Sequence, residues 1–167
     1  MGGYAPKTTA RVPNLDRTLL VGKCWVVDGD TIRIGGAPIR LAGIDAPELD
    51  HPYGEQAKWA MVRLCKGQTI RAEIIAGETS HDRYVARCYL PDGRDLAAEL
   101  VRMGLAIDWP KFSGGRYSHL EVPGVRKKLW RCDARQKGRL DETPLGARIA
   151  AQRQRRGDDL ELIEPET

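Results

Sequence analysis

The stretch VVDGDTIRIGGAPIRLAGIDAPEL, residues 26–49, carries most of the information about the fold of this chain. Apolar and polar residues alternate in TIRI (31–34), and IRLAGI (39–44) resumes a strand pattern. The Gly-Gly pair between these segments supplies a hairpin turn. An apolar, β-rich run at 19–27 precedes the DGD turn. We therefore predict three antiparallel strands that end at Asp45.

The segments that follow predict a helix, two strands and a second helix. At 55–66, apolar residues recur three and four positions apart, which is the helical period, and a glycine follows as the expected C-cap. Alternation returns at 68–75 and at 84–90, which indicates a fourth and a fifth strand. Residues 96–103 predict a short helix that ends at Gly104.

This order of elements is typical of an OB-fold, a small five-stranded Greek-key barrel whose surface binds nucleotides and oligosaccharides. The predicted class is mainly β with helices (α+β), with two to three helices capping the barrel. Residues 109–117 are expected to form a loop. The pair Pro123-Gly124 is expected to interrupt a third helix that reaches Trp130.

The predicted domain covers residues 19–132. Residues 1–18 are expected to form a flexible N-terminal segment. Residues 133–167 are expected to form a charged C-terminal extension, helical around 146–156 and disordered at its acidic end, DDLELIEPET.

The composition predicts a globular domain with an anionic partner. Hydrophobic residues make up 41% of the chain, charged residues 30%, and the net charge is +4, which favours polyanions. No stretch reaches the roughly 20 apolar residues of a membrane helix, so no membrane partner is expected. The N-terminus lacks the apolar core of a signal peptide. The expected location is therefore cytoplasmic, or secreted or periplasmic if a signal was removed.

Several classes of chemistry lack their motifs. The chain contains no GxSxG, no P-loop and no GxGxxG, and its three histidines have no ligand spacing. Its four cysteines are too far apart in sequence for a CxxC zinc knuckle, and their disulfide pairing stays open. Cys24 and Cys88 lie in apolar strand-like runs and are expected to be buried thiols.

Acidic residues lie at the ends of neighbouring predicted strands. Four carboxylates are expected to gather at one rim of the barrel: Asp28, Asp30, Asp45 and Glu48. Like charges held together raise one another's pKa unless a cation offsets them, and oxygen-only ligands favour Ca²⁺ or, as a weaker candidate, Mg²⁺. Arg40 on the adjacent strand suits bidentate phosphate recognition. The alternative is that the DGD sequence is only a turn and that Asp45 only caps a strand.

Three motifs, VVDGDT, IRLAGIDAPE and ELVRMGLA, resemble the staphylococcal-nuclease-like (thermonuclease) family in order and spacing, over roughly residues 22–130. This SNase-like resemblance implies a five-stranded OB-type barrel and calcium-dependent cleavage of DNA and RNA. It further implies a role for each matched residue. Asp30, Asp45 and the Ala46 backbone carbonyl would bind the metal, Asp28 would lie near it without binding it, Glu48 would activate water, and Arg40 would bind phosphate.

The second phosphate-binding arginine is less clear, because the family pattern D-[RK]-Y-G-R is replaced here by HDRYVARCYL. Counting backward from the fifth strand favours Arg83, and counting forward leaves Arg87 as the alternative. The two share strand parity, so both are expected on one face. Three aromatic residues are candidates to stack on a base, with simple packing as the alternative for each: Tyr84, Trp109 and Tyr117.

The predicted function is that of a Ca²⁺-dependent nuclease with little base specificity, acting on DNA and RNA with a preference for single strands, as a monomer. Two other functions stay open. One is an SNase-like barrel that binds nucleic acid without cleaving it. The other is a plain OB-fold single-strand binder whose acids are structural, which would bind without divalent ions and more weakly as salt rises.

Overall fold

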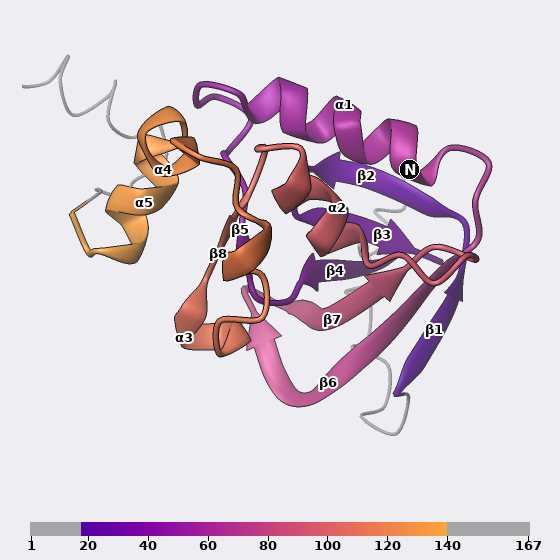
Figure 1. The fold of residues 1–167 in the computed structure, drawn as a ribbon. Helices are drawn as coiled ribbons and strands as arrows, with labels where there is room; N and C mark the ends of the chain where they lie inside the picture. The colour runs from indigo at the N-terminus through magenta and orange to yellow at the C-terminus, as the bar shows by residue number, and fades with distance from the viewer. Residues whose placement is uncertain (1–17, 140–167) are drawn as a thin grey trace, which may run out of the picture.

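The computed structural model describes residues 18–139 (Figure 1). The first predicted strand is broken at Lys23 into β1 (Leu19–Gly22) and β2 (Cys24–Asp28). β1 pairs with β6 (Ile70–Ser80), whereas β2 pairs with β3 (Thr31–Ile34). This break allows one bent segment to contribute to two different ladders. The five strands expected from the sequence therefore appear as the six strands of the main sheet.

The strand order of the main sheet is β1-β6-β7-β4-β3-β2. Every pairing is antiparallel except that of β4 (Ala37–Leu41) with β7 (Arg83–Tyr89), which is parallel. The two edge strands, β1 and β2, are consecutive in the chain, so the strongly curved sheet brings its edges together at Lys23 (Figure 1). Within residues 18–139 no ladder joins β1 to β2, and the fold is an OB-like α+β arrangement rather than a fully hydrogen-bonded barrel.

The strand expected at 39–44 ends earlier than predicted. β4 stops at Leu41, and Gly43 turns the chain with a φ of +77° that favours glycine. The chain then forms β5 (Ile44–Asp45), which pairs with β8 (Ile107–Asp108) in a separate two-stranded sheet. Asp45 is therefore held by the small sheet, beside the rim of the large one.

Two helices agree with the sequence prediction. α1 (Gly54–Cys65) packs against β2, and its C-terminal turn is followed by Gly67 with a φ of +70°. α2 (Leu96–Arg102) is capped by Asp95, whose carboxylate accepts hydrogen bonds from the amides of Ala97 and Ala98. Both helices cover the main core.

The C-terminal part differs from the prediction in detail. The expected loop at 109–117 contains a short helix, α3 (Pro110–Ser113), and a 3₁₀ turn, η1 (Ser118–Leu120), follows it. Two helices begin after Gly124, α4 (Val125–Lys128) and α5 (Trp130–Gln136). The described residues thus contain five α-helices, two of them only four residues long, instead of two to three.

Helix α5 continues through position 132, where the domain boundary was expected. Residues 133–136 continue this helix, and Arg135 contacts Glu48. The expected flexible segment before Thr18 and the expected helix and acidic end within 140–167 lie outside the described residues.

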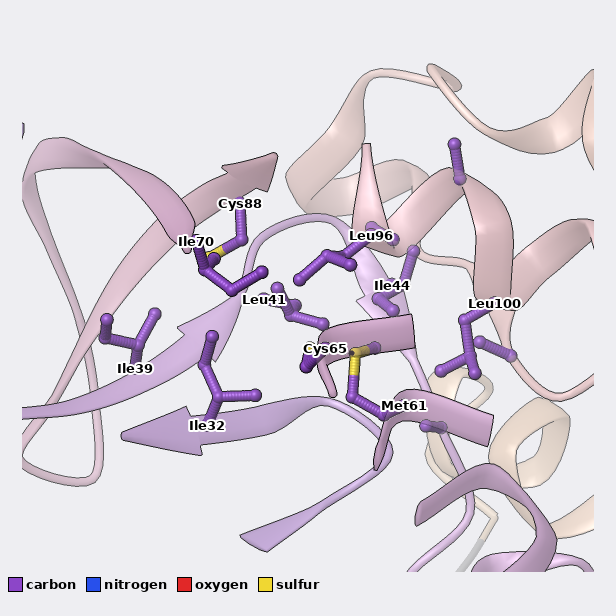
Figure 2. Packing of buried hydrophobic residues seen from close by; sticks show 14 of the residues in the cluster. Ile32, Ile39, Leu41, Ile44, Met61, Cys65, Ile70, Cys88, Leu96 and Leu100 are labelled. Atoms are coloured by element: carbon purple, nitrogen blue, oxygen red, sulfur yellow. Dashed lines mark hydrogen bonds between the residues drawn. The ribbon is translucent and has the colours of Figure 1, made fainter. Parts of the chain in front are cut away.

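Two hydrophobic clusters hold these elements together. The larger one combines side chains from the main sheet with α1 and α2, including Ile32, Ile39, Met61 and Leu100, none of which is measurably exposed (Figure 2). Full burial of such a side chain stabilises the fold by roughly 1.5–3 kcal/mol. A second, small cluster fastens α4 and α5 to β8 and consists of Ile107, Val125, Leu129 and Cys132, with Val122 at its edge.

The cysteines are free thiols in this structure. Cys88 is fully buried, as expected, whereas Cys24 is only half-buried. Among residues 18–139, no helix is long and apolar enough to span a membrane.

Candidate active site

The DGD turn between β2 and β3 places Asp30 against the loop that follows β5. The Asp30 Oδ2 atom accepts a hydrogen bond from the Ala46 amide at 3.1 Å, and Oδ1 accepts one from the Thr31 hydroxyl at 3.3 Å. Gly29 makes this approach possible, because a Cβ there would lie 2.8 Å from the Ala57 Cβ and 3.0 Å from the Ala46 Cβ. The turn is thus also a packing contact, and it brings Asp30 next to the amide that follows Asp45.

Arg40 on β4 is fixed beside Asp30. Its Nη1 atom lies 3.0 Å from Asp30 Oδ2, and Nη1 and Nη2 donate to the carbonyls of Leu41 and Ile44 at 3.1 and 2.9 Å. The two charged side chains are only 12% and 11% exposed. Because the guanidinium is held at three points, its orientation is set before any ligand binds.

Asp45 is fully buried, yet neither of its carboxylate oxygens has a hydrogen-bond partner. Burial raises the pKa of Asp45 to about 7; Arg135 opposes this rise, and Asp30 adds to it. A buried carboxylate without a hydrogen-bond partner is costly, and a cation beside Asp45 would offset that cost.

Asp28 is the last residue of β2, at the start of the same turn. Its Oδ1 atom accepts a hydrogen bond from the Asp30 amide at 3.2 Å. Burial raises its pKa to about 7, and the charges of Asp30 and Glu48 add to the rise. Asp28 therefore belongs to the electrostatic cluster.

Glu48 comes from the loop between β5 and α1. Its carbonyl accepts a hydrogen bond from the His51 amide at 2.9 Å, and a Cβ at Gly54 would overlap this carbonyl. The loop is thus packed closely on the start of α1, while the Glu48 side chain stays 48% exposed. Glu48 can therefore meet both solvent and the buried acids.

Arg135 of α5 enters the same cluster, and sequence reasoning missed it. Its Nη1 atom donates to Glu48 Oε1 at 2.8 Å and lies 3.7 Å from Asp45 Oδ1. The sequence does hold a signal for it. Leu129, which precedes α5, and Cys132 on α5 are buried, and Arg135 follows Cys132 at the next helical step, three residues on.

The structure separates the two candidate arginines of β7. Arg83 donates from Nη1 to the Thr31 hydroxyl at 2.8 Å, so its guanidinium adjoins the turn that carries Asp30. Its Nε donates to the Ser80 carbonyl at 3.0 Å. Arg87 lies opposite Glu73 in the β6–β7 ladder, four residues further along the strand. The geometry thus joins Arg83, and not Arg87, to the acidic cluster through Thr31.

The three aromatic residues predicted to stack on a base are buried or half-buried. Tyr117 is only 2% exposed and donates its hydroxyl to Asp95 Oδ2 at 2.7 Å, so the expectation that its ring stacks on a base is wrong. Tyr84 is half-buried against the main core. Trp109 is half-buried with its ring edge-on to Phe112, the centroids 5.0 Å apart.

Whether these residues suit a metal ion depends on their donor set. Among the described residues, no group of three or more His, Cys, Asp or Glu side chains forms a complete metal site. Asp30 nevertheless accepts a hydrogen bond from the amide of Ala46, the residue after Asp45, and both oxygens of Asp45 lack donors. This oxygen-only set fits a hard divalent cation that takes its remaining ligands from the backbone, water or substrate.

Comparison with known proteins identifies a family and several relatives. Residues 38–122 match the family described as staphylococcal nuclease homologue. The succinoglycan biosynthesis protein ExoI of Rhizobium meliloti is 29% identical over 144 residues, which cover 75% of this chain and 74% of that protein.

Two further relatives carry names that refer to nucleases. An uncharacterized endonuclease of Escherichia coli O157:H7 is 34% identical over 92 residues, 53% of this chain and 60% of that protein. A probable staphylococcal-like nuclease CAN1 of Oryza sativa is 30% identical over 103 residues, 59% of this chain and 30% of that protein. The match thus spans less than two thirds of each of these two relatives.

Proposed function

This chain belongs to the staphylococcal nuclease family, and on that basis we propose that it is a calcium-dependent nuclease that hydrolyses phosphodiester bonds of DNA and RNA with little base specificity. One observation carries the proposal. Asp45 is a fully buried carboxylate with no hydrogen-bond donor, and Asp30, Arg40 and Glu48 surround it electrostatically. Burying a carboxylate without a donor costs folding free energy, and a purely structural role would not account for that cost.

The calcium ion would be held by the carboxylates of Asp30 and Asp45 and by the Ala46 carbonyl. Bound there, it would supply Lewis acidity toward a phosphate oxygen. We expect Ca²⁺ to be preferred over Mg²⁺, because Ca²⁺ accepts a flexible set of oxygen ligands whereas Mg²⁺ demands near-ideal octahedral geometry.

Glu48 would take the proton of the attacking water. The water oxygen bonds to phosphorus, the opposite P–O bond breaks, and the leaving oxygen is protonated from solvent. Glu48 suits this role because its side chain is half-exposed at the edge of the buried acids. General-base assistance of this kind contributes roughly 10²–10⁴ in rate.

Arg40 and Arg83 would stabilise the negative charge that develops on the phosphate. Arg40 is oriented by two carbonyls and Asp30, and Arg83 by Ser80 and Thr31. Preorganised donors are effective because they need not reorient during the reaction. All these groups address phosphate rather than bases, so we expect low base specificity and a preference for single strands, whose phosphates reach the site more easily.

The direct test is digestion of single-stranded DNA and RNA oligonucleotides in Ca²⁺, in Mg²⁺ and in chelator. We expect cleavage in Ca²⁺, less in Mg²⁺ and none in chelator. Glu48→Gln should lower the rate by roughly 10²–10⁴ while leaving the circular dichroism spectrum unchanged. Cleavage that persists in chelator, or that is unaffected in Glu48→Gln, would contradict the proposal.

A non-catalytic nucleic-acid-binding module is the second candidate, favoured by one observation. The segment HDRYVARCYL lacks the Y-G-R portion of the family pattern D-[RK]-Y-G-R, so the second phosphate-binding arginine has lost its usual sequence context. Oligonucleotide binding in chelator without cleavage in any divalent ion would support this function.

A further inference from the structure

Arg135 is the one member of the charge cluster that comes from the C-terminal helix, at the opposite end of the described chain from the acids (Figure 1). We propose that Arg135 is a positioning residue of this site: it anchors Glu48 and supplies a fixed positive charge that weakens the binding of the divalent cation. This inference rests on the proposed function and adds to it a residue that tunes the metal affinity.

The placement of Arg135 is not that of a surface ion pair. Its side chain is 12% exposed, and its Nε and Nη2 atoms are buried without a hydrogen-bond partner. Burying a guanidinium with two unpaired nitrogens costs free energy, which the neighbouring acids must offset.

The helix fixes where the charge lies. Leu129 and Cys132 are 2% and 0% exposed and anchor α5 in the small cluster with Ile107. Arg135 follows on the same face, so its guanidinium is delivered to Asp45 and Glu48 by packed side chains rather than by a mobile loop.

Arg135 changes the net charge that a divalent cation meets at this site. Four carboxylates, those of Asp28, Asp30, Asp45 and Glu48, share the site with three guanidiniums, those of Arg40, Arg135 and, through Thr31, Arg83. With every acid ionised the balance is 3 − 4 = −1. Without Arg135 the balance is 2 − 4 = −2, and a divalent cation would be attracted more strongly.

The contact with Glu48 has a separate consequence. A glutamate that is 48% exposed can adopt many rotamers, and ordering such a side chain costs entropy. The 2.8 Å contact from Arg135 Nη1 restricts these rotamers before substrate binds. Loss of Arg135 should therefore slow the chemical step even though metal binding becomes tighter.

The test compares Arg135→Gln, Arg135→Lys and Lys137→Gln in the full chain. Lys137 is the matched control, because it carries the same charge at the end of the same helix but pairs with Asp133. Calorimetric titration with CaCl₂ alone measures affinity without substrate. Initial rates at saturating Ca²⁺ give kcat and KM for one oligonucleotide, and circular dichroism verifies the fold.

We expect Arg135→Gln to bind Ca²⁺ about tenfold more tightly and to lose about tenfold in kcat, with KM nearly unchanged. Arg135→Lys should keep the wild-type Ca²⁺ affinity within about threefold but recover only part of kcat, because it keeps the charge and loses the planar fork. Lys137→Gln should change neither quantity.

Unchanged or weaker Ca²⁺ affinity in Arg135→Gln would overturn the inference, as would tighter binding without a loss of kcat. If Arg135→Gln does not fold, Arg135→Lys decides: a wild-type kcat in that variant overturns the inference. If the wild-type chain itself cleaves nothing, the proposed function fails, whereas the CaCl₂ titration still reports on the charge of Arg135.

Discussion

Asp45 and Asp108 are both fully buried aspartates, and they lie on the two paired strands β5 and β8. Asp108 is saturated: its Oδ1 accepts from the Ser113 hydroxyl at 2.6 Å and the Tyr117 amide at 3.3 Å, and its Oδ2 accepts from the Ser118 hydroxyl at 2.6 Å. Asp45 accepts no hydrogen bond at all.

The contrast distinguishes a structural carboxylate from one that needs a partner from outside the protein. Asp108 ties α3 and η1 to the small sheet, and nothing remains for a ligand to satisfy. Asp45 is equally remote from water but has only the guanidinium of Arg135 at 3.7 Å. Burial alone therefore does not mark a functional acid; burial without donors does.

The largest expected difference is in activity. Asp45→Asn should lower Ca²⁺-dependent cleavage on the order of a hundredfold or more, because it removes a charged ligand candidate. Asp108→Asn should leave the turnover of the folded fraction within about twofold but destabilise the fold by roughly 1–3 kcal/mol, because its charge-assisted hydrogen bonds are weakened. Oligonucleotide digestion and urea unfolding measure the two effects. A large loss of activity in Asp108→Asn with little loss in Asp45→Asn would contradict this comparison.

A similar comparison holds for the cations of β7. Arg83→Ala should lower kcat by roughly tenfold to a hundredfold, because it removes a charged donor that adjoins Thr31 beside Asp30. Arg87→Ala removes the same charge from the same strand, but opposite Glu73, and should have little effect. Equal losses in the two variants, or a larger loss for Arg87, would show that the functional arginine has been assigned wrongly.

A further effect is on stability without metal. The pKa of Asp45 is raised to about 7, so between about pH 4 and 7 the native state binds a proton that the unfolded chain has released, and stability falls as pH rises. In chelator, the free energy of unfolding of Asp45→Asn should therefore gain on that of the wild type as pH rises, by up to about 1.4 kcal/mol per pH unit. The gain should level off above about pH 7. Urea unfolding across this range measures it.

Asp92→Asn is the control for this pH profile. Asp92 lies in an exposed turn, where hydrogen bonds from Arg94 lower its pKa, so its replacement should give no growing advantage. A pH-independent difference between Asp45→Asn and wild type would mean that Asp45 is solvated rather than buried.

Much of the fold was predictable because local patterns and tertiary structure agree. The alternation in 31–34 and the helical period of 55–66 correspond to β3 and α1. The break at Lys23 and the separation of β5 from β4 were not predictable, because both depend on which partner strand each segment meets. The short helix α3 was not predictable, because its four residues are too few to show a helical period.

The site was predictable only where sequence neighbours carry it. The DGD turn and the D-x-P-E stretch predicted that Asp30, Asp45 and Glu48 would gather; in the structure Asp30 contacts the Ala46 amide, and the charges of Asp30 and Glu48 act on Asp45. The helical spacing after Cys132 places Arg135 on the packed face of its helix, but Arg135 lies 87 positions from Glu48, and no local pattern identifies that residue as its partner. Tyr117 was misassigned because sequence does not show that its hydroxyl is already bound by Asp95.

The small cluster under α4 and α5 has a consequence for hydrogen exchange. Among the described residues, three buried side chains of this segment, Val125, Leu129 and Cys132, pack on Ile107 of β8, and Arg126 and Gln136 donate to the Asp108 carbonyl, whereas the far larger main cluster holds the large sheet. The C-terminal pair should therefore open as its own cooperative unit, at a lower free energy than global unfolding. Each such opening withdraws Arg135 while the acids stay in place, so amide protection in α5 should be lost before protection in β3 and β4.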